Sequence, residues 1–108
     1  MDLSKQRCIP CEGKGIPALN AKEIKTNLKF VKGWKAIKNH EITKEFKFSN
    51  FVKALDFVNK VGVVAEKEGH HPDLSLGWGY VKITLFTHAV KGLSVNDFVL
   101  AAKIDKLK

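Results

Sequence analysis

The period of the apolar residues changes several times along the chain, and these changes constrain the fold more than any other feature of the sequence. Over residues 34–48, WKAIKNHEITKEFKF, apolar and polar side chains tend to alternate, as expected of strands with one buried face. One side would carry Ile42, Phe46 and Phe48, and the other side Thr43, Glu45 and Lys47. A turn near Asn39 and His40 divides the segment, so we expect two antiparallel strands.

The next segment, residues 49–69, has the helical period instead. Its apolar stripe is expected to consist of Phe51, Leu55, Val58, Gly62 and Ala65. Ser49 or Asn50 is placed to cap the first turn, because a short polar side chain there accepts a hydrogen bond from an otherwise unpaired backbone amide. Gly69 is placed to end the helix, since glycine readily adopts the left-handed conformation common at helix C-termini.

A second pair of strands and a final helix are predicted after Gly69. The alternating apolar positions are Leu74, Leu76 and Trp78 in the first strand, then Val81, Ile83 and Leu85 in the second. Gly77 and Gly79 mark the turn between them. The last segment, LSVNDFVLAAKID, is predicted to be a helix capped by Ser94. Its inward-facing residues would be Phe98, Ala101 and Ile104 or Ala102.

A shorter helix is predicted before the first strand pair, in LNAKEIKTNLKF. Asn20 is placed as its N-cap with Glu23 three residues later, and Ile24 and Leu28 share one face. The predicted order is therefore α-β-β-α-β-β-α. Since strands joined by tight turns are antiparallel, we expect an α+β domain, a four-stranded antiparallel sheet with three helices packed on one face.

This domain is expected to span residues 19–108, preceded by an irregular N-terminal arm over residues 1–18 that is rich in proline and glycine. The arm carries Cys8 and Cys11 in the motif CIPC. Without a second cysteine pair this motif lacks the four ligands of a structural zinc site, and it does not lie between a strand and a helix, as a thioredoxin-like motif would. A structural or incidental role is favoured, while redox chemistry or a metal shared between two chains stays open.

The chain of 108 residues has a formal net charge of +8. A positive charge of this size would favour nucleic-acid binding. Two features argue against it: Arg7 is the single arginine, and the lysines are dispersed from Lys5 to Lys108 and form no basic cluster. A solvated surface is therefore favoured, and nucleic-acid binding or an acidic partner is the alternative. No apolar run reaches the ~20 residues of a membrane span, and the N-terminus lacks the apolar core of a signal peptide, so we expect no membrane partner and a cytoplasmic location.

Three of the four histidines stand at the two ends of the second predicted strand pair, His70 and His71 before it and His88 after it. Adjacent residues of a regular strand point to opposite faces, so the two neighbours can serve one site only where the backbone is irregular. Gly69 supplies a helix end, and Pro72 holds the residue before it in an extended conformation. His70 and His71 are thus expected at a corner of the chain.

Hairpin geometry is expected to bring His88 to the same corner. With the turn centred near Trp78, paired positions sum to about 156, which places residue 68 beside His88. Since the unperturbed pKa of histidine is ~6.5, one imidazole can donate and another accept a proton near neutral pH. The C-terminal end of the helix, together with Glu66, would favour a charged ring at His70. The cluster therefore predicts acid–base chemistry.

Other interpretations of these histidines remain open. A histidine after a helix end can simply cap that helix, with no catalytic role. A histidine before proline can likewise be simply a turn residue. Three imidazoles can also hold zinc with water as the fourth ligand, although adjacent histidines rarely reach one metal and no HExxH spacing is present. No serine or cysteine is placed as an obvious nucleophile, so covalent catalysis is not indicated.

The segment EGHHPDLSLGWGYVKITLFTHAVKGLSVNDFVLAA closely resembles the pterin-4a-carbinolamine dehydratase family. The matching elements, with fitting spacing, are Glu66, then His70-His71-Pro72, then VKITLFTH ending at His88, then GLSVNDF with Asp97. WKAIKNHEITKEFKFSNFVKALDFVNKVG resembles the strand-strand-helix segment of the same family, so the resemblance covers nearly the whole chain from about Leu19. The arm with its cysteines resembles that of bacterial-type members.

The resemblance implies a reaction in which 4a-hydroxytetrahydropterin, such as 4a-hydroxytetrahydrobiopterin, loses water to give quinonoid dihydropterin, without a metal or an organic cofactor. Aromatic amino-acid hydroxylases produce that substrate, so the reaction recycles tetrahydropterin. By carry-over, His70 and His88 are the catalytic acid and base candidates, and His71 binds or orients the pterin. The substrate-binding residues would further include Gly69, Pro72, Phe86, Thr87 and Ala89, with Glu66 in support.

Asp97 and Leu74 each bear on what the resemblance implies for the site. In the family an aspartate at the place of Asp97 supports the catalytic histidines, while here it also stands at N3 of a capping box that begins at Ser94. Both roles are compatible. Many members carry tryptophan at the place of Leu74, so pterin affinity or preference is expected to differ, and Trp78 is too near the turn to replace that ring.

The resemblance also implies self-association as a homodimer or homotetramer, and a pathway link to an aromatic amino-acid hydroxylase. The alternative function is protein binding, because some family members act as dimerisation cofactors, and hence transcriptional coactivators, for a homeodomain protein. The bacterial-type arm makes that role less expected here.

Overall fold

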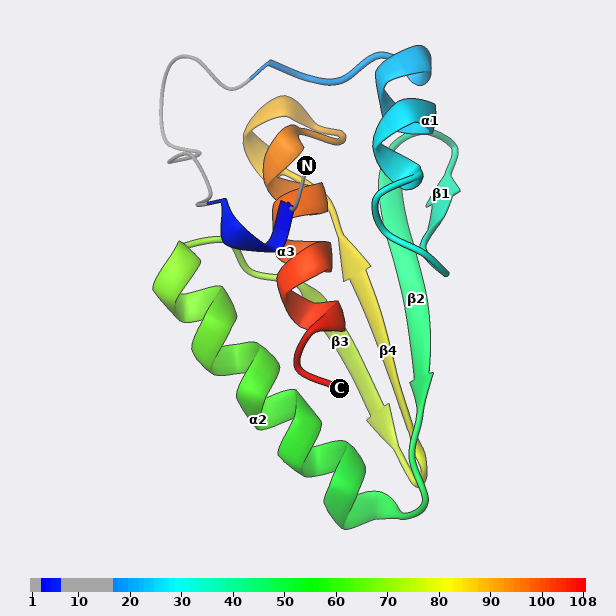
Figure 1. Cartoon of the computed structure of the whole chain (residues 1–108), viewed down its shortest axis with the longest axis vertical. Helices are drawn as coiled ribbons and strands as arrows, with labels where there is room; N and C mark the ends of the chain where they lie inside the picture. The colour runs from blue at the N-terminus through cyan, green and yellow to red at the C-terminus, as the bar shows by residue number, and fades with distance from the viewer. Residues whose placement is uncertain (1–2, 7–16) are drawn as a thin grey trace.

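The structure, a computed structural model, describes residues 3–6 and 17–108 (Figure 1). Its helices are α1 (Ala21–Leu28), α2 (Phe51–Glu68) and α3 (Val95–Asp105), and its strands are β1 (Lys35–Ile37), β2 (Glu41–Lys47), β3 (Asp73–Gly77) and β4 (Tyr80–Leu85). Two short 3-10 helices are η1 (Leu3–Lys5) and η2 (His88–Val90). The predicted order α-β-β-α-β-β-α is confirmed. Cys8 and Cys11 lie outside the described residues, so the expectations for CIPC stay predictions.

The four strands form one antiparallel sheet in the order β1-β2-β4-β3. β2 and β4 are the central strands, with Ile42 opposite Leu85 and Lys47 opposite Tyr80. α2 and α3 lie across the same side of this sheet (Figure 1). The predicted fold class, an α+β domain with a four-stranded antiparallel sheet, is therefore confirmed, while the central pairing of β2 with β4 was not predicted.

The core lies between this face of the sheet and the helices. The sheet contributes fully or almost fully buried side chains at Ile42, Phe46, Val81, Ile83 and Leu85. α3 is buried on almost all sides, including the predicted inward positions Phe98, Ala101 and Ile104. Leu3 of η1 also belongs to the core, and Lys103 Nζ donates to the backbone oxygen of Ser4 at 2.8 Å. No element was predicted from the sequence at residues 3–5.

α2 begins and ends where the sequence indicated. The Asn50 side chain accepts a hydrogen bond from the backbone amide of Lys53 at 2.9 Å, and Gly69 ends the helix in the left-handed conformation with φ of 68°. A residue with a Cβ would be strained at that φ, so glycine permits the sharp exit of the chain.

The predicted apolar stripe of α2 was wrong at most positions. The buried residues are Ala54, Phe57, Val61 and Ala65, and Val58 is half-buried. The side chains of Phe51 and Leu55 are 42% and 40% exposed, and Gly62 is exposed as well. α2 carries apolar residues on more than one side, so its periodicity is compatible with either of two apolar stripes facing the core. Packing against the sheet and α3 buries the stripe that contains Phe57.

The hairpin between β3 and β4 is tight. Gly77 pairs with Tyr80, which leaves Trp78 and Gly79 as the two turn residues. Gly79 takes the left-handed conformation with φ of 79°, which glycine adopts without the strain that a Cβ would cause. The turn is therefore centred between Trp78 and Gly79 rather than on Trp78, and each predicted pairing shifts by one position. None of the helices in the described part of the chain has the length and apolarity that a membrane crossing requires.

Candidate functional site

The three histidines singled out in the sequence line one cavity at the end of the sheet where α2 stops and β4 ends. This cavity, of about 300 Å³, is lined by Gly69, His70, His71, His88 and Ala89. The chain leaves α2 through Gly69, and the backbone amide of His70 still bonds to the oxygen of Ala65 at 3.2 Å. The helix end therefore fixes where the His70 and His71 side chains begin.

His70 forms the most buried part of the site. Its side chain is 5% exposed, and its Nε2 lies 2.6 Å from Oδ1 of Asp97. Since an ionised carboxylate can only accept hydrogen bonds, the proton of this contact resides on Nε2 of the imidazole. The bond fixes both the orientation and the tautomer of the His70 ring.

Asp97 is completely buried, and three donors hold its carboxylate. Oδ1 accepts from His70, while Oδ2 accepts from the Thr87 hydroxyl at 2.8 Å and from the backbone amide of Ser94 at 2.9 Å. The hydroxyls of Thr87 and Ser94 are also 2.7 Å apart. The N-terminal end of α3 carries partial positive charge, which stabilises the carboxylate there. The capping-box prediction for Asp97 is confirmed, and the same side chain contacts a predicted catalytic histidine.

His71 lies on the outer side of the cavity and pairs with Glu66. The two side chains are 64% and 80% exposed, and Nε2 of His71 is 2.8 Å from Oε2 of Glu66. Such an exposed pair is weak because solvent screens it. The His71 ring can therefore exchange Glu66 for a bound molecule at little cost.

His88 is the first residue of η2, which follows β4 after Phe86 and Thr87. It is exposed, and its ring centroid lies 4.3 Å from that of Phe86. Among the described residues, the imidazole nitrogens of His88 have no hydrogen-bond partner. His88 thus presents to the cavity an imidazole that packs against the Phe86 ring.

The fourth histidine, His40, lies unexpectedly close to this group. Its ring centroid is 5.1 Å from that of Phe86, and its Nδ1 is 3.3 Å from Oε1 of Glu41. The pairing of β2 with β4 brings the β1–β2 turn beside the end of β4. Nothing in the local pattern around Asn39 and His40 indicates that pairing, so His40 could not be connected with the site from the sequence.

Three predicted substrate-binding residues do not line the cavity. Thr87 is fully buried and reaches the site only through Asp97, while Phe86 packs against the His88 ring and Pro72 is half-buried at the corner. Leu74 lies on the edge strand β3, and Trp78, 72% exposed, is in the hairpin turn. Among residues 3–6 and 17–108, no three His, Cys, Asp or Glu side chains are grouped so that they could hold a metal ion.

The chain is similar to known proteins over nearly its whole length. The family described as pterin 4 alpha carbinolamine dehydratase matches residues 17–107. A protein of Alkaliphilus metalliredigens, provisionally named a pterin-4-alpha-carbinolamine dehydratase, is 53% identical over 106 residues, which cover 97% of this chain and 95% of that protein. The Arabidopsis thaliana protein named pterin-4-alpha-carbinolamine dehydratase 2, mitochondrial, is 43% identical over 99% of this chain and 59% of its own length.

Solved structures show the same fold. A transcriptional coactivator/pterin dehydratase from Brucella melitensis superposes with a TM-score of 0.80 and 30% identity over 84% of this chain and 98% of that one. A pterin dehydratase-like protein described as a RuBisCO assembly factor in the alpha-carboxysome gives a TM-score of 0.60 and 28% identity over 69% of this chain and 88% of its own. On its sequence and on its fold, the chain belongs to the pterin-4-alpha-carbinolamine dehydratase family.

Proposed function

We propose that this protein catalyses the dehydration of a 4a-hydroxytetrahydropterin to quinonoid dihydropterin in the cavity lined by His70, His71 and His88. The observation that carries this proposal is the pairing of two unlike imidazoles on one cavity. His70 is buried and tied to Asp97, whereas His88 is exposed and has no hydrogen-bond partner among the described residues.

The reaction needs one proton delivered and one removed. The hydroxyl group on C4a leaves as water when it receives a proton, and the adjacent ring nitrogen N5 loses its proton as the C4a–N5 double bond forms. The two transfers balance, so no oxidant, metal or organic cofactor enters the proposed reaction. A pair of imidazoles on one cavity suits this exchange, because one ring acts as the acid while the other acts as the base.

His70 and His88 are the proposed acid–base pair. Asp97 holds the His70 ring in a single orientation, as the buried carboxylate of a catalytic triad holds its histidine. His71 binds the pterin through its ring nitrogen, since its bond to the exposed Glu66 is easily exchanged. Because the edge strand β3 carries Leu74 rather than tryptophan, the pterin receives less aromatic contact from that strand.

The test is the dehydration of synthetic 4a-hydroxytetrahydropterin, followed by its ultraviolet absorbance. The wild-type protein is expected to accelerate the loss of water. The catalysed rate of His88→Ala is expected to be about 10²–10⁴-fold lower than that of the wild type. Lys82→Ala, an exposed substitution on β4, serves as the control and should keep the full rate. A wild-type rate no higher than the spontaneous one would refute the proposal.

Self-association forms part of the proposal. The apolar stripe of α2 that includes Phe51, Leu55 and Gly62 faces away from the core of one chain. An exposed apolar stripe of this kind marks a protein contact in many proteins, since monomers rarely leave such patches uncovered. We assign this stripe to the contact between copies in a homodimer or homotetramer. The substrate would come from an aromatic amino-acid hydroxylase acting in the same pathway.

A protein-binding role is the second candidate function. It is favoured by the names of the two solved relatives, one a transcriptional coactivator/pterin dehydratase and the other a RuBisCO assembly factor. The exposed stripe of α2 is the surface such a role would use. Two variants distinguish the two functions. His88→Ala would stop dehydration and preserve protein binding, whereas Leu55→Glu would stop protein binding and preserve dehydration.

A further inference from the structure

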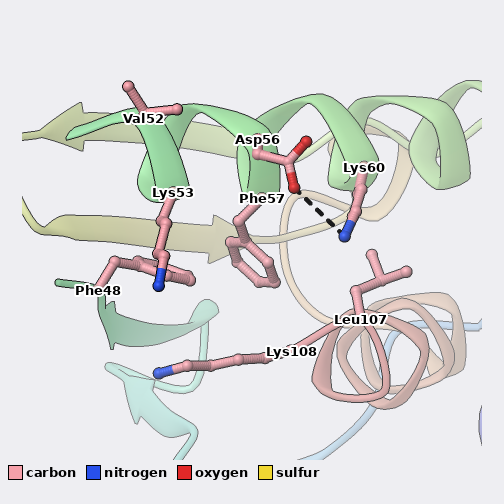
Figure 2. Close-up of a pocket in the computed structure, with 8 residues that line it drawn as sticks. All are labelled: Phe48, Val52, Lys53, Asp56, Phe57, Lys60, Leu107 and Lys108. Carbon is pink, nitrogen blue, oxygen red and sulfur yellow. Dashed lines mark ion pairs between the residues drawn. The ribbon is translucent and has the colours of Figure 1, made fainter. Parts of the chain in front are cut away.

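A second, larger cavity lies at the opposite end of α2 from the histidines (Figure 2). Its volume is about 560 Å³, compared with about 300 Å³ for the histidine cavity. The lining residues come from the end of β2, the first half of α2 and the C-terminal residues, and are Phe48, Val52, Lys53, Asp56, Phe57, Lys60, Leu107 and Lys108. The two cavities share no lining residue.

The inner wall of this cavity is apolar and aromatic. The rings of Phe48 and Phe57 lie with centroids 5.1 Å apart at an interplanar angle of 41°. Phe57 is almost completely buried and packs in turn on Phe46, so its ring is held in place. Leu107 closes the wall from the α3 side, while Val52 points away from the other lining side chains (Figure 2). The wall therefore offers a fixed surface for a flat apolar group.

The rim of the cavity is positively charged. Its charged side chains are the three ammonium groups of Lys53, Lys60 and Lys108 and the one carboxylate of Asp56, an excess of two positive side-chain charges. Asp56 pairs with Lys60 at 3.3 Å, which leaves the other two ammonium groups without a carboxylate partner in the described part of the chain. Lys108 Nζ donates to the backbone oxygen of Lys47 at 2.7 Å and lies 4.8 Å from the Phe48 ring centroid.

Two of these cations flank the aromatic wall. Lys53 projects from α2 on the same side as the other lining side chains, and Lys108 extends towards the Phe48 ring (Figure 2). The ammonium group of Lys53 has no hydrogen-bond or ion-pair partner among the described residues. An anion between Lys53 and Lys108 would gain two charge-assisted hydrogen bonds, and a ring attached to that anion would stack on Phe48.

We propose that this cavity binds a small aromatic anion, a flat ring system that bears one carboxylate or sulfonate. The volume lies within the range of about 300–1,000 Å³ usual for small-molecule sites, and such sites combine apolar walls with a few placed polar groups. The positive charge of the rim favours a negatively charged ligand, and the Phe48 and Phe57 rings favour a ligand that is aromatic. This site is separate from the proposed dehydration and does not depend on it.

The experiment uses two fluorescent dyes that share their rings and differ in charge, 1-anilinonaphthalene-8-sulfonate and the uncharged N-phenyl-1-naphthylamine. The folded protein is expected to bind the sulfonate at one saturable site, and the uncharged dye more weakly. Lys53→Gln should weaken sulfonate binding about tenfold or more, as expected for the loss of one charge-assisted hydrogen bond, and leave the uncharged dye unaffected. Phe48→Leu should weaken both dyes.

Two controls make the result specific. Lys35→Gln removes the same charge from an exposed position on β1, outside the cavity, and should bind the sulfonate as the wild type does. His88→Ala should also bind it unchanged, because the histidine cavity is a different site. Equal affinity for the two dyes, an equal effect of Lys53→Gln and Lys35→Gln, or loss of binding in His88→Ala would each overturn the proposal.

Discussion

The Nε2 atom of His70 lies 2.6 Å from Oδ1 of Asp97, although 27 residues separate the two in the chain. The contact exists because the C-terminus of α2 and the N-terminus of α3 meet behind one cavity. His70 follows the last turn of α2, and the partial positive charge at the N-terminus of α3 stabilises the carboxylate of Asp97. Two helix ends thus bring together a buried imidazole and the carboxylate that orients it.

Asp97→Asn is expected to lower kcat by about 10²–10⁴-fold with a smaller change in KM. The amide keeps one oxygen that can accept from the Ser94 amide or the Thr87 hydroxyl, so the fold should persist. The amide lacks the second carboxylate oxygen. In the wild type that oxygen accepts from His70 and so keeps the proton on Nε2 of the ring. The checks are steady-state kinetics and the ¹⁵N chemical shifts of the His70 ring, which report its tautomer.

A purely structural role of Asp97 predicts a different result. In that case the loss of activity would follow the loss of folded protein, and the His70 nitrogen shifts of the folded variant would match those of the wild type. Such an outcome would remove Asp97 from the proposed mechanism and keep it only as the N3 residue of the α3 capping box.

Thr87→Val is expected to destabilise the protein by about 1–3 kcal/mol. The hydroxyl of Thr87 is buried, donates to Asp97 at 2.8 Å and contacts the Ser94 hydroxyl at 2.7 Å. Valine of similar shape therefore removes one donor from the buried carboxylate and one partner from the buried Ser94 hydroxyl. Urea unfolding measures the change. The matched control is Thr84→Val, a half-buried threonine of β4 whose hydroxyl lies 3.3 Å from that of Thr43, and it should cost clearly less.

His71→Ala is expected to raise KM for the pterin about tenfold and to leave kcat nearly unchanged, because the proposed role of His71 is to bind the substrate. Folding stability should change by less than about 0.5 kcal/mol in both His71→Ala and Glu66→Gln, since their pair is exposed and screened by solvent. A fall in kcat as large as that of His88→Ala would instead make His71 part of the acid–base pair.

Leu55→Glu is expected to shift the protein from its assembled form to the monomer in sedimentation velocity. A charge in the middle of the exposed α2 stripe would have to be buried without a partner in the assembly, at a cost of several kcal/mol. Thr26→Glu, an equal change of charge on the exposed side of α1, should keep the assembled form. If the wild type is a monomer at high concentration, the assignment of this stripe to self-association fails.

Local features of this fold could be predicted from the sequence because they depend on residues a few positions apart. The caps at Asn20, Asn50, Gly69 and Ser94 are all found where the sequence indicated, since each satisfies backbone groups of its own helix. The convergence of the three histidines was also predictable, because a helix end and a hairpin place them at one corner.

Long-range features could not be predicted in the same way. The buried side of α2 depends on what packs against it, and the apolar residues Phe51 and Leu55 satisfy the helical period as well as Ala54 and Phe57 do. Likewise, the pairing of β2 with β4 depends on contacts across about 40 residues, and no turn sets it. The position of His40 beside Phe86 follows from that pairing, so it also escaped prediction.

The central claim is that His70 and His88 face the same pterin ring, and a crystal structure with a bound dihydropterin tests it most directly. The account predicts the bicyclic ring in the cavity between Gly69 and Ala89, with a ring nitrogen of His88 within about 2.6–3.2 Å of the pterin atoms that exchange protons and His70 on the same cavity wall. A dihydropterin bound elsewhere, or in this cavity with His88 turned away from it, would contradict the account.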